Sequence, residues 1–253
     1  MFIDTHVHLC DSRYDSDRDA MLARAFDAGV KYHINIGAEL PECRKVAAFE
    51  HPGVLKAVGL HPHYIDTLSL EVLEEFKGYF SSGKMAAVGE IGLDYFKSPN
   101  SKESQIEAFE KLLSYASECL LPVIIHSREA HSDVAAILKK HNPPKKGIIH
   151  CFTGDYETAK TFHDMGYLLG IGGVVTFPNA GPLKDTVARM PLESLVLETD
   201  APWLAPQNVR GKRNEPSYIP DIAIAVAGIK GIKTGEVEES TTANTAKMFG
   251  LSI

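Results

Sequence analysis

The sequence predicts an α/β fold, a (β/α)8 barrel of the TIM type in which residues 1–253 form one domain. Short apolar, β-branched runs recur eight times along the chain, and segments with helical spacing lie between most of them. Strands that alternate with helices are typical of a parallel sheet, and eight such units in about 250 residues fit a closed barrel better than an open sheet. A doubly wound open sheet is the alternative fold.

The eight predicted strands share short length, β-branched or apolar side chains and turn residues at their ends. In chain order they are Phe2–Leu9, Val30–Gly37, Val54–Leu60, Met85–Gly89, Pro122–Ile125, Gly147–Ile149, Tyr167–Ile171 and Leu195–Leu197.

Helical signals are clearest in the second half of the chain. Asn100 with Glu103 resembles a helix cap with its partner, and the apolar stripe that follows is Ile106, Phe109, Leu112, Leu113 and Ala116. Asp155 is expected to cap a helix that Gly166 ends. Residues 219–229 and 236–249 predict two helices near the end of the chain.

Composition excludes few classes of protein. The net charge of -7 argues against a passive, non-specific nucleic-acid binder, but not against an enzyme whose bound metal ions supply local positive charge. The four cysteines are scattered, which predicts reduced thiols and a cytoplasmic protein. The N-terminus has no basic-then-apolar leader, and the longest uncharged run, residues 165–183, carries five glycines and two prolines, so no membrane span is expected.

Asp4, His6 and His8 alternate in the first predicted strand, so their side chains point to one face. A buried strand face with two imidazoles needs partners for them, and a divalent cation satisfies both directly. Asp4 is expected to orient a histidine and not to bind an ion itself.

Other residues with metal-binding side chains follow later predicted strands. They are His61, His63, Glu90, His126, His150 and Asp200. The carboxyl ends of parallel barrel strands open onto one face, so these side chains are expected to converge. Four imidazoles (His6, His8, His126, His150) and two carboxylates (Glu90, Asp200) exceed the needs of one tetrahedral zinc and suit two bridged ions.

The remaining histidines and Glu198 are interpreted as structural residues and not as metal ligands. A single histidine after an apolar run is usually a hydrogen-bonded structural residue, and five histidines fall in that class: His33, His51, His131, His141 and His163. Glu198 is also expected to be structural, with a carboxylate at the rim of the metal site as the alternative.

Seven motifs, in order through nearly the whole chain, resemble the TatD family of metal-dependent deoxyribonucleases. They are Asp4-Thr-His-Val-His8, Gly59-Leu-His-Pro-His63, Gly89-Glu-Ile-Gly-Leu-Asp-Tyr95, His126-Ser-Arg128, His150-Cys-Phe-Thr-Gly154, Glu198-Thr-Asp-Ala-Pro-Trp203 and Arg210-Gly-Lys-Arg-Asn-Glu-Pro216. The resemblance implies a TIM barrel and a hydrolase of DNA phosphodiester bonds, often a 3′→5′ exonuclease. It implies DNA, single-stranded or at an end, as the partner.

The resemblance also implies two divalent metal ions. His6, His8, Glu90 and Asp200 would hold one ion, and Glu90, His126 and His150 the second, with Glu90 bridging. These ligand types accept magnesium, manganese and zinc, so the sequence leaves the metal open.

The expected mechanism assigns roles to further residues. Asp200 would orient a metal-activated water and take its proton, with Glu90 as the bridging carboxylate and His61 as a donor to the phosphate or leaving group. His63 is a weaker candidate for phosphate binding. Four basic residues are expected to grip flanking phosphates, namely Arg128, Arg210, Lys212 and Arg213, although a solvated loop is the alternative for residues 210–213. Tyr95, Phe96 and Trp203 are candidates to stack a terminal base.

Two other functions remain open from the sequence. The same barrel and metals serve an ester, lactone or amide hydrolase, such as a D-aminoacyl-tRNA deacylase. A non-catalytic nucleic-acid or protein-binding module is a second alternative, against which the net acidity and the complete ligand set argue.

Overall fold

The computed structural model describes residues 1–252, and within them eight strands form one sheet in the order β1 to β8. The strands are β1 Phe2–Val7, β2 Val30–Gly37, β3 Val54–Val58, β4 Ala87–Asp94, β5 Val123–Arg128, β6 Gly147–Ile149, β7 Leu168–Ile171 and β8 Leu195–Leu197. The predicted number and order of strands are confirmed.

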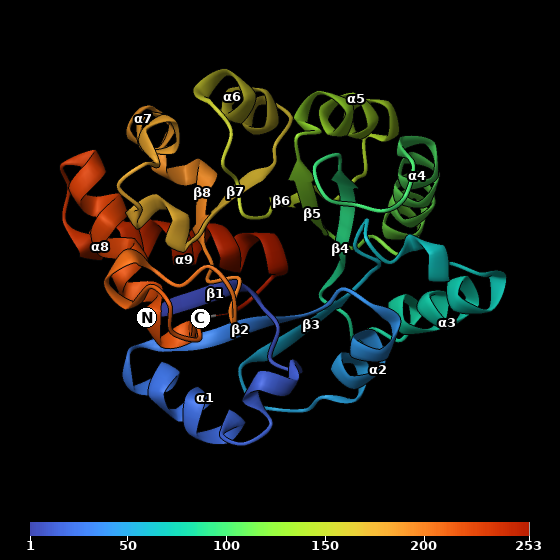
Figure 1. Ribbon diagram of the computed structural model, residues 1–253, viewed down its shortest axis with the longest axis horizontal. Helices are drawn as coiled ribbons and strands as arrows, with labels where there is room; N and C mark the ends of the chain where they lie inside the picture. The colour runs from blue at the N-terminus through green and yellow to red at the C-terminus, as the bar shows by residue number, and fades with distance from the viewer. Residues whose placement is uncertain (253) are drawn as a thin grey trace. The chain divides into compact units, whose positions relative to one another are not determined.

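Helices alternate with the strands (Figure 1). They are α1 Arg18–Asp27, α2 Leu40–Ala48, α3 Leu70–Ser81, α4 Lys102–Glu118, α5 His131–His141, α6 Tyr156–Asp164, α7 Gly181–Arg189, α8 Ile219–Lys230 and α9 Thr234–Phe249. Short 3-10 turns lie in the loops, among them η1 Ser12–Tyr14, η3 Gly173–Thr176 and η6 Pro216–Tyr218. No helix within residues 1–252 has both the length and the apolar character needed to cross a membrane.

The chain folds as two compact units. The first unit comprises residues 1–34 and 151–252, and the second comprises Asn35–His150.

In the first unit the last strand lies beside the first, as a barrel requires. Val7 and Ala201 form a parallel bridge, and the Asp200 N–H donates to the His6 carbonyl at 2.9 Å. β7 pairs in parallel with β8, with Leu169 opposite Leu195. α9 packs on both β1 and β8.

In the second unit β3 to β6 pair in parallel, with Ala57 opposite Ala87 and Val123 opposite Gly147. β4 and β5 extend further than predicted because their pairing continues to Asp94 opposite Arg128. Glu90 and His126 therefore lie inside strands and not just after them, which corrects the expected strand ends.

Two of the predicted caps are confirmed and one is wrong. The Asp155 side chain accepts the Thr158 N–H at 2.9 Å to cap α6, and Gly166 follows that helix with a φ of 87°. α4 is capped by Ser101, which accepts the Ser104 N–H at 3.2 Å. The Asn100 amide instead donates to the Pro62 and His63 carbonyls, at 2.9 and 3.3 Å, and so holds the loop after β3.

Candidate metal centre

The first unit brings three of the predicted ligands together. The Nε2 atoms of His6 and His8 lie 3.2 Å apart, and Asp200 Oδ1 lies 3.8 and 3.7 Å from them. His6 is fully buried, His8 is nearly so, and the Asp200 side chain is 16% exposed. The triangle thus opens to solvent on the side of the carboxylate.

Asp4 holds the strands that carry this triangle. Its carboxylate accepts the N–H of His6 at 3.2 Å, the N–H of Thr199 at 3.0 Å and the Thr199 hydroxyl at 2.5 Å. Burial raises the pKa of Asp4 to about 7, although these hydrogen bonds oppose the rise. Asp4 therefore contacts the backbone beside two predicted ligands, as a positioning residue would.

The loop after β8 fixes Asp200 in an unusual backbone conformation. Asp200 has a φ of 54°, in the left-handed region that aspartate and asparagine tolerate better than other side chains. The buried Asn214 amide donates to the carbonyls of Thr199 and Trp203, at 2.8 and 2.6 Å, on either side of Asp200. The Tyr14 hydroxyl in turn donates to the Asn214 carbonyl at 2.6 Å.

Glu198, two residues before Asp200, is fully buried and accepts the Cys151 N–H at 2.7 Å through Oε1. A side chain at Gly170 would place its Cβ 2.1 Å from Glu198 Oε2, so this part of β7 leaves room for the carboxylate. These contacts support the structural interpretation of Glu198.

The second unit brings Glu90, His126 and His150 together. Glu90 Oε1 lies 2.8 Å from Nδ1 of His126 and 3.8 Å from Nε2 of His150. Gly92, with a φ of 144°, lies opposite His126 in the sheet, and a Cβ there would be 2.0 Å from the His126 carbonyl oxygen. The glycine thus permits the close approach of β4 and β5 at this cluster.

Asp94, absent from the predicted site residues, extends this cluster. Its Oδ2 lies 3.0 Å from His63 Nε2 and 3.3 Å from His126 Nε2. Burial raises the pKa of Asp94, but His126 and the N–H groups of Lys97 and Phe96 outweigh it and hold that pKa well below its usual range. Burial lowers the pKa of His126, but Asp94 and Glu90 outweigh it, so that pKa is raised.

His61 lies beside this cluster with its Nε2 3.8 Å from Glu90 Oε1. Burial lowers the pKa of His61 to about 3, so the ring is neutral near pH 7. The His63 N–H donates to Nδ1 of His61 at 3.1 Å, which assigns the proton of the neutral ring to Nε2. In this arrangement Nε2 is a hydrogen-bond donor.

The donor sets of the two units fit divalent cations. The first unit offers two imidazole nitrogens and one carboxylate oxygen within 4.8 Å of one another. Two nitrogens bound to one ion at about 2.1 Å lie roughly 3.0 to 3.4 Å apart in octahedral or tetrahedral geometry, and the His6–His8 separation falls in that range. In the second unit the donor atoms of Glu90, His126 and His61 lie within the same distance of one another, as do those of His61, His63 and Asp94. Nε2 of the predicted ligand His150 lies 3.8 Å from Glu90 Oε1.

The predicted phosphate-binding residues differ in their present contacts. The Arg128 guanidinium lies 4.3 Å from the ring centre of Phe96, which is 51% exposed. Arg210 lies 4.6 Å from the Phe177 ring centre and contacts Gln207 Oε1 at 3.5 Å, while Lys212 is exposed. The substrate-binding roles of His63, Arg128 and Arg210 stay predictions.

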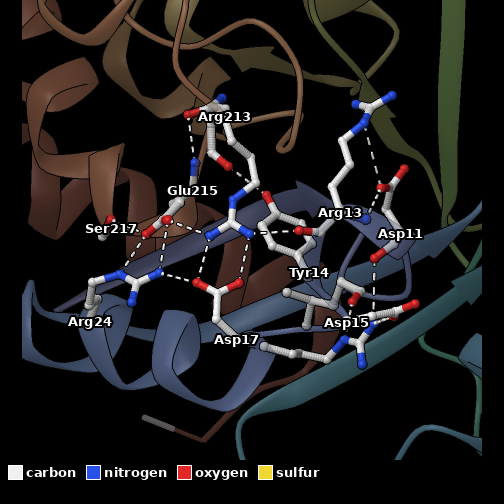
Figure 2. A network of polar contacts seen from close by, with 12 residues as sticks. Asp11, Arg13, Tyr14, Asp15, Asp17, Arg24, Arg213, Glu215 and Ser217 are labelled. Atoms are coloured by element: carbon white, nitrogen blue, oxygen red, sulfur yellow. Dashed lines mark hydrogen bonds and ion pairs between the residues drawn. The ribbon is translucent and has the colours of Figure 1, made fainter.

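Arg213 is bound within an ionic network that consists of Asp17, Arg24, Arg213 and Glu215 (Figure 2). Its guanidinium donates twice to Asp17, at 2.7 and 2.8 Å, and once to Glu215, at 2.9 Å. Arg24 donates to both oxygens of Glu215 at 2.8 Å. These contacts tie the loop after β8 to α1, and the phosphate contact of Arg213 stays a prediction.

The fold and the ligand clusters define the class of protein, a metal-dependent hydrolase built on a (β/α)8 barrel. Residues 3–250 match the family described as TatD related DNase. A solved structure of YjjV, a TatD homologue from Escherichia coli K12, has a TM-score of 0.95 and 34% identity, and the match covers 99% of this chain and 98% of that one.

Two curated relatives show the same likeness over nearly their full length. An uncharacterized metal-dependent hydrolase of Bacillus subtilis, YabD, is 36% identical, with 100% of both chains covered. A protein of Klebsiella pneumoniae named 3′-5′ ssDNA/RNA exonuclease TatD is 34% identical, with 99% of this chain and 98% of that protein covered. The chain therefore belongs to the TatD-related DNase family, and the predicted class of metal-dependent hydrolase is confirmed.

Proposed function

We propose that this protein is a 3′→5′ exonuclease that hydrolyses phosphodiester bonds of single-stranded DNA with two divalent metal ions. The observation that carries the proposal is the pair of imidazole and carboxylate clusters, one in each unit. Relatives at 34% identity that are named 3′-5′ ssDNA/RNA exonuclease support this choice of substrate over a neutral ester. The four free cysteines within residues 1–252 fit a reducing compartment, so we place the protein in the cytoplasm.

His6, His8 and Asp200 would hold one cation, and Glu90, His126 and His150 would hold the other. The bridging role of Glu90 stays a prediction. Bound divalent ions supply Lewis-acid polarisation of the phosphate and lower the pKa of water. The identity of the metal is decided by geometry and availability as much as by these ligand types.

The remaining steps belong to side chains of the protein. Asp200, the most exposed of the first-unit ligands, would accept the proton of the attacking water. His61 would donate its Nε2 proton toward the phosphate or the leaving oxygen, a role that its neutral state and its tautomer support. Arg128 would bind a flanking phosphate, since a guanidinium pairs with two oxygens at once.

A matrix of metals against substrates tests the proposal. The chelated protein is reloaded with magnesium, manganese or zinc and mixed with single-stranded DNA labelled at the 5′ end, a small phosphodiester, a carboxylic ester or a D-aminoacyl-tRNA. We expect a ladder of products shortened from the 3′ end, dependent on metal. Hydrolysis of the ester or the aminoacyl-tRNA without any DNA cleavage would refute it.

A further inference from the structure

Arg13, in η1 of the first unit, lies over the ring of Trp203, which itself contacts the predicted metal ligand His8. Its guanidinium carbon lies 4.9 Å from the ring centre of Trp203. The Trp203 ring in turn meets the His8 ring edge-on, with centres 4.8 Å apart. One aromatic ring therefore separates the guanidinium from the His6, His8 and Asp200 triangle.

The hydrogen-bond donors of this guanidinium remain available. Among residues 1–252 its contacts are the Trp203 ring and Asp11, whose Oδ1 lies 3.8 Å from Arg13 Nε, beyond hydrogen-bond distance. The Asp11 carboxylate instead accepts the Arg13 N–H at 2.8 Å, as the cap of η1. The Arg13 side chain is 48% exposed, whereas the Arg213 guanidinium makes four hydrogen bonds.

The backbone of Arg13 is held in place by the ionic network. Arg213 donates to the Arg13 carbonyl at 2.7 Å, while its other donors bind Asp17 and Glu215. Figure 2 shows the Arg13 side chain extending away from these ion pairs. A fixed backbone and a ring beneath the guanidinium reduce the side-chain entropy that binding would cost.

We propose that the Arg13–Trp203 pair binds a backbone phosphate of single-stranded DNA adjacent to the scissile bond. The proposal rests on the proposed nuclease function. A planar guanidinium with free donors matches two phosphate oxygens, and its stacking on Trp203 sets the plane in which it presents them. The fixed Arg213 thus contributes indirectly, by holding Arg13.

The test uses the full chain loaded with magnesium. Binding of a fluorescent oligothymidylate with phosphorothioate linkages, which resist cleavage, is followed by anisotropy over a range of NaCl concentrations. The variants are Arg13→Ala, Arg13→Lys, Trp203→Phe and Trp203→Ala. Arg189→Ala is the matched control, because Arg189 also stacks on an aromatic ring, that of Tyr156 at 3.5 Å, but lies at the end of α7.

For Arg13→Ala we expect about a tenfold rise in Kd and a slope of log K against log salt that is shallower by about 0.7. Arg13→Lys should keep the slope and raise Kd about threefold, since lysine retains the charge but cannot form the bidentate hydrogen bonds of a guanidinium with the phosphate. Trp203→Ala should weaken binding about fivefold and Trp203→Phe less. On cleavable DNA, Arg13→Ala should raise KM and lower kcat less than threefold.

Two outcomes overturn the proposal in different ways. If the wild-type protein cleaves single-stranded DNA and Arg13→Ala behaves like Arg189→Ala in Kd, slope and KM, the phosphate site is wrong and the nuclease function stands. If the wild-type protein neither binds nor cleaves single-stranded DNA, the nuclease function fails and the phosphate site fails with it. A fall in kcat at constant KM for Arg13→Ala would also overturn the site, since it indicates damage to the ligand triangle.

Discussion

The two units hold their ligand clusters in different ways. In the first unit, positions are set through the backbone: Asp4 binds the N–H groups of His6 and Thr199, and Asn214 binds the carbonyls on either side of Asp200. In the second unit, the supporting carboxylate of Asp94 instead contacts the histidine side chains themselves. The contacts run from Glu90 to His126, from His126 to Asp94 and from Asp94 to His63.

The difference predicts how each cluster responds to substitution. Substitution of one predicted ligand in the first unit should not move the other two, because Asp4 and Asn214 hold the strands and loops through backbone N–H and carbonyl groups. Substitution of a residue in the second unit should disturb the side chain that it contacts, because leaving a buried polar group without its partner costs free energy. The following substitutions test this contrast, beginning with the largest expected effect.

Asp200→Asn should lower kcat on single-stranded DNA by about a thousandfold, because in the proposed mechanism the residue would both hold a cation and accept a proton. Asparagine tolerates the left-handed backbone at this position, so the melting temperature should change little. Steady-state kinetics with magnesium and manganese, with circular dichroism of the same samples, measure both effects. Near-normal kcat in this variant would remove Asp200 from the mechanism.

Asp94→Ala should lower kcat/KM by about 10- to 100-fold, because His63 and His126 both lose their shared carboxylate. The pH–rate profile should also shift, since the carboxylate helps to raise the pKa of His126. Asp66→Ala, an exposed aspartate of the same unit, is the control. Equal kinetics in the two variants would show that the second unit is no more interconnected than the first.

Asp4→Asn should cost about 1.5 kcal/mol of unfolding free energy, because an amide cannot accept the three hydrogen bonds that the carboxylate accepts. Metal affinity should fall only modestly if the first unit is held redundantly through Asn214. Urea unfolding and metal titration give the two quantities. A complete loss of metal binding in a folded variant would contradict independent positioning in the first unit.

Glu215→Gln should lower stability by about 1 kcal/mol at pH 7, since Glu215 pairs with both Arg24 and Arg213. Burial raises the pKa of Glu215, but the two arginines outweigh it, so its pKa lies below the ordinary value. The stabilisation is therefore present above the unfolded pKa of about 4.3 and is lost as the pH falls through the lower folded pKa. Urea unfolding at pH 7 and pH 3 should show the difference from wild type shrinking in acid, with Glu239→Gln as an exposed control.

Much of the fold could be predicted because strand runs and helical stripes are local patterns. The period of two in the predicted strand Phe2–Leu9 placed His6 and His8 on one face, and the structure places their Nε2 atoms 3.2 Å apart, although β1 ends at Val7. The same rule applied to β4 would have found Asp94, which lies four residues after Glu90 on the same strand. It was missed because the predicted strand ended at Gly89, whereas pairing with β5 extends it to Asp94.

The role of the loop after β8 could not be predicted from local patterns. Its run of basic residues is compatible with phosphate binding, with solvation and with ion pairing, and only tertiary structure distinguishes them. Arg213 pairs with Asp17, which lies nearly two hundred positions earlier in the chain, and Asn214 donates hydrogen bonds to the carbonyl groups around Asp200. Arg13 lies in none of the sequence motifs, and only the tertiary structure shows that its guanidinium lies over the Trp203 ring.

Trp203 is the single tryptophan of the chain, and its ring meets that of His8. Fluorescence excited at the long-wavelength edge of the protein absorption band, where only tryptophan absorbs, therefore comes from this one indole beside His6, His8 and Asp200. Metal binding and displacement of Arg13 would each change the surroundings of that indole. The protein thus carries its own optical probe, and occupancy of the first unit could be followed in real time without a label and separately from that of the second.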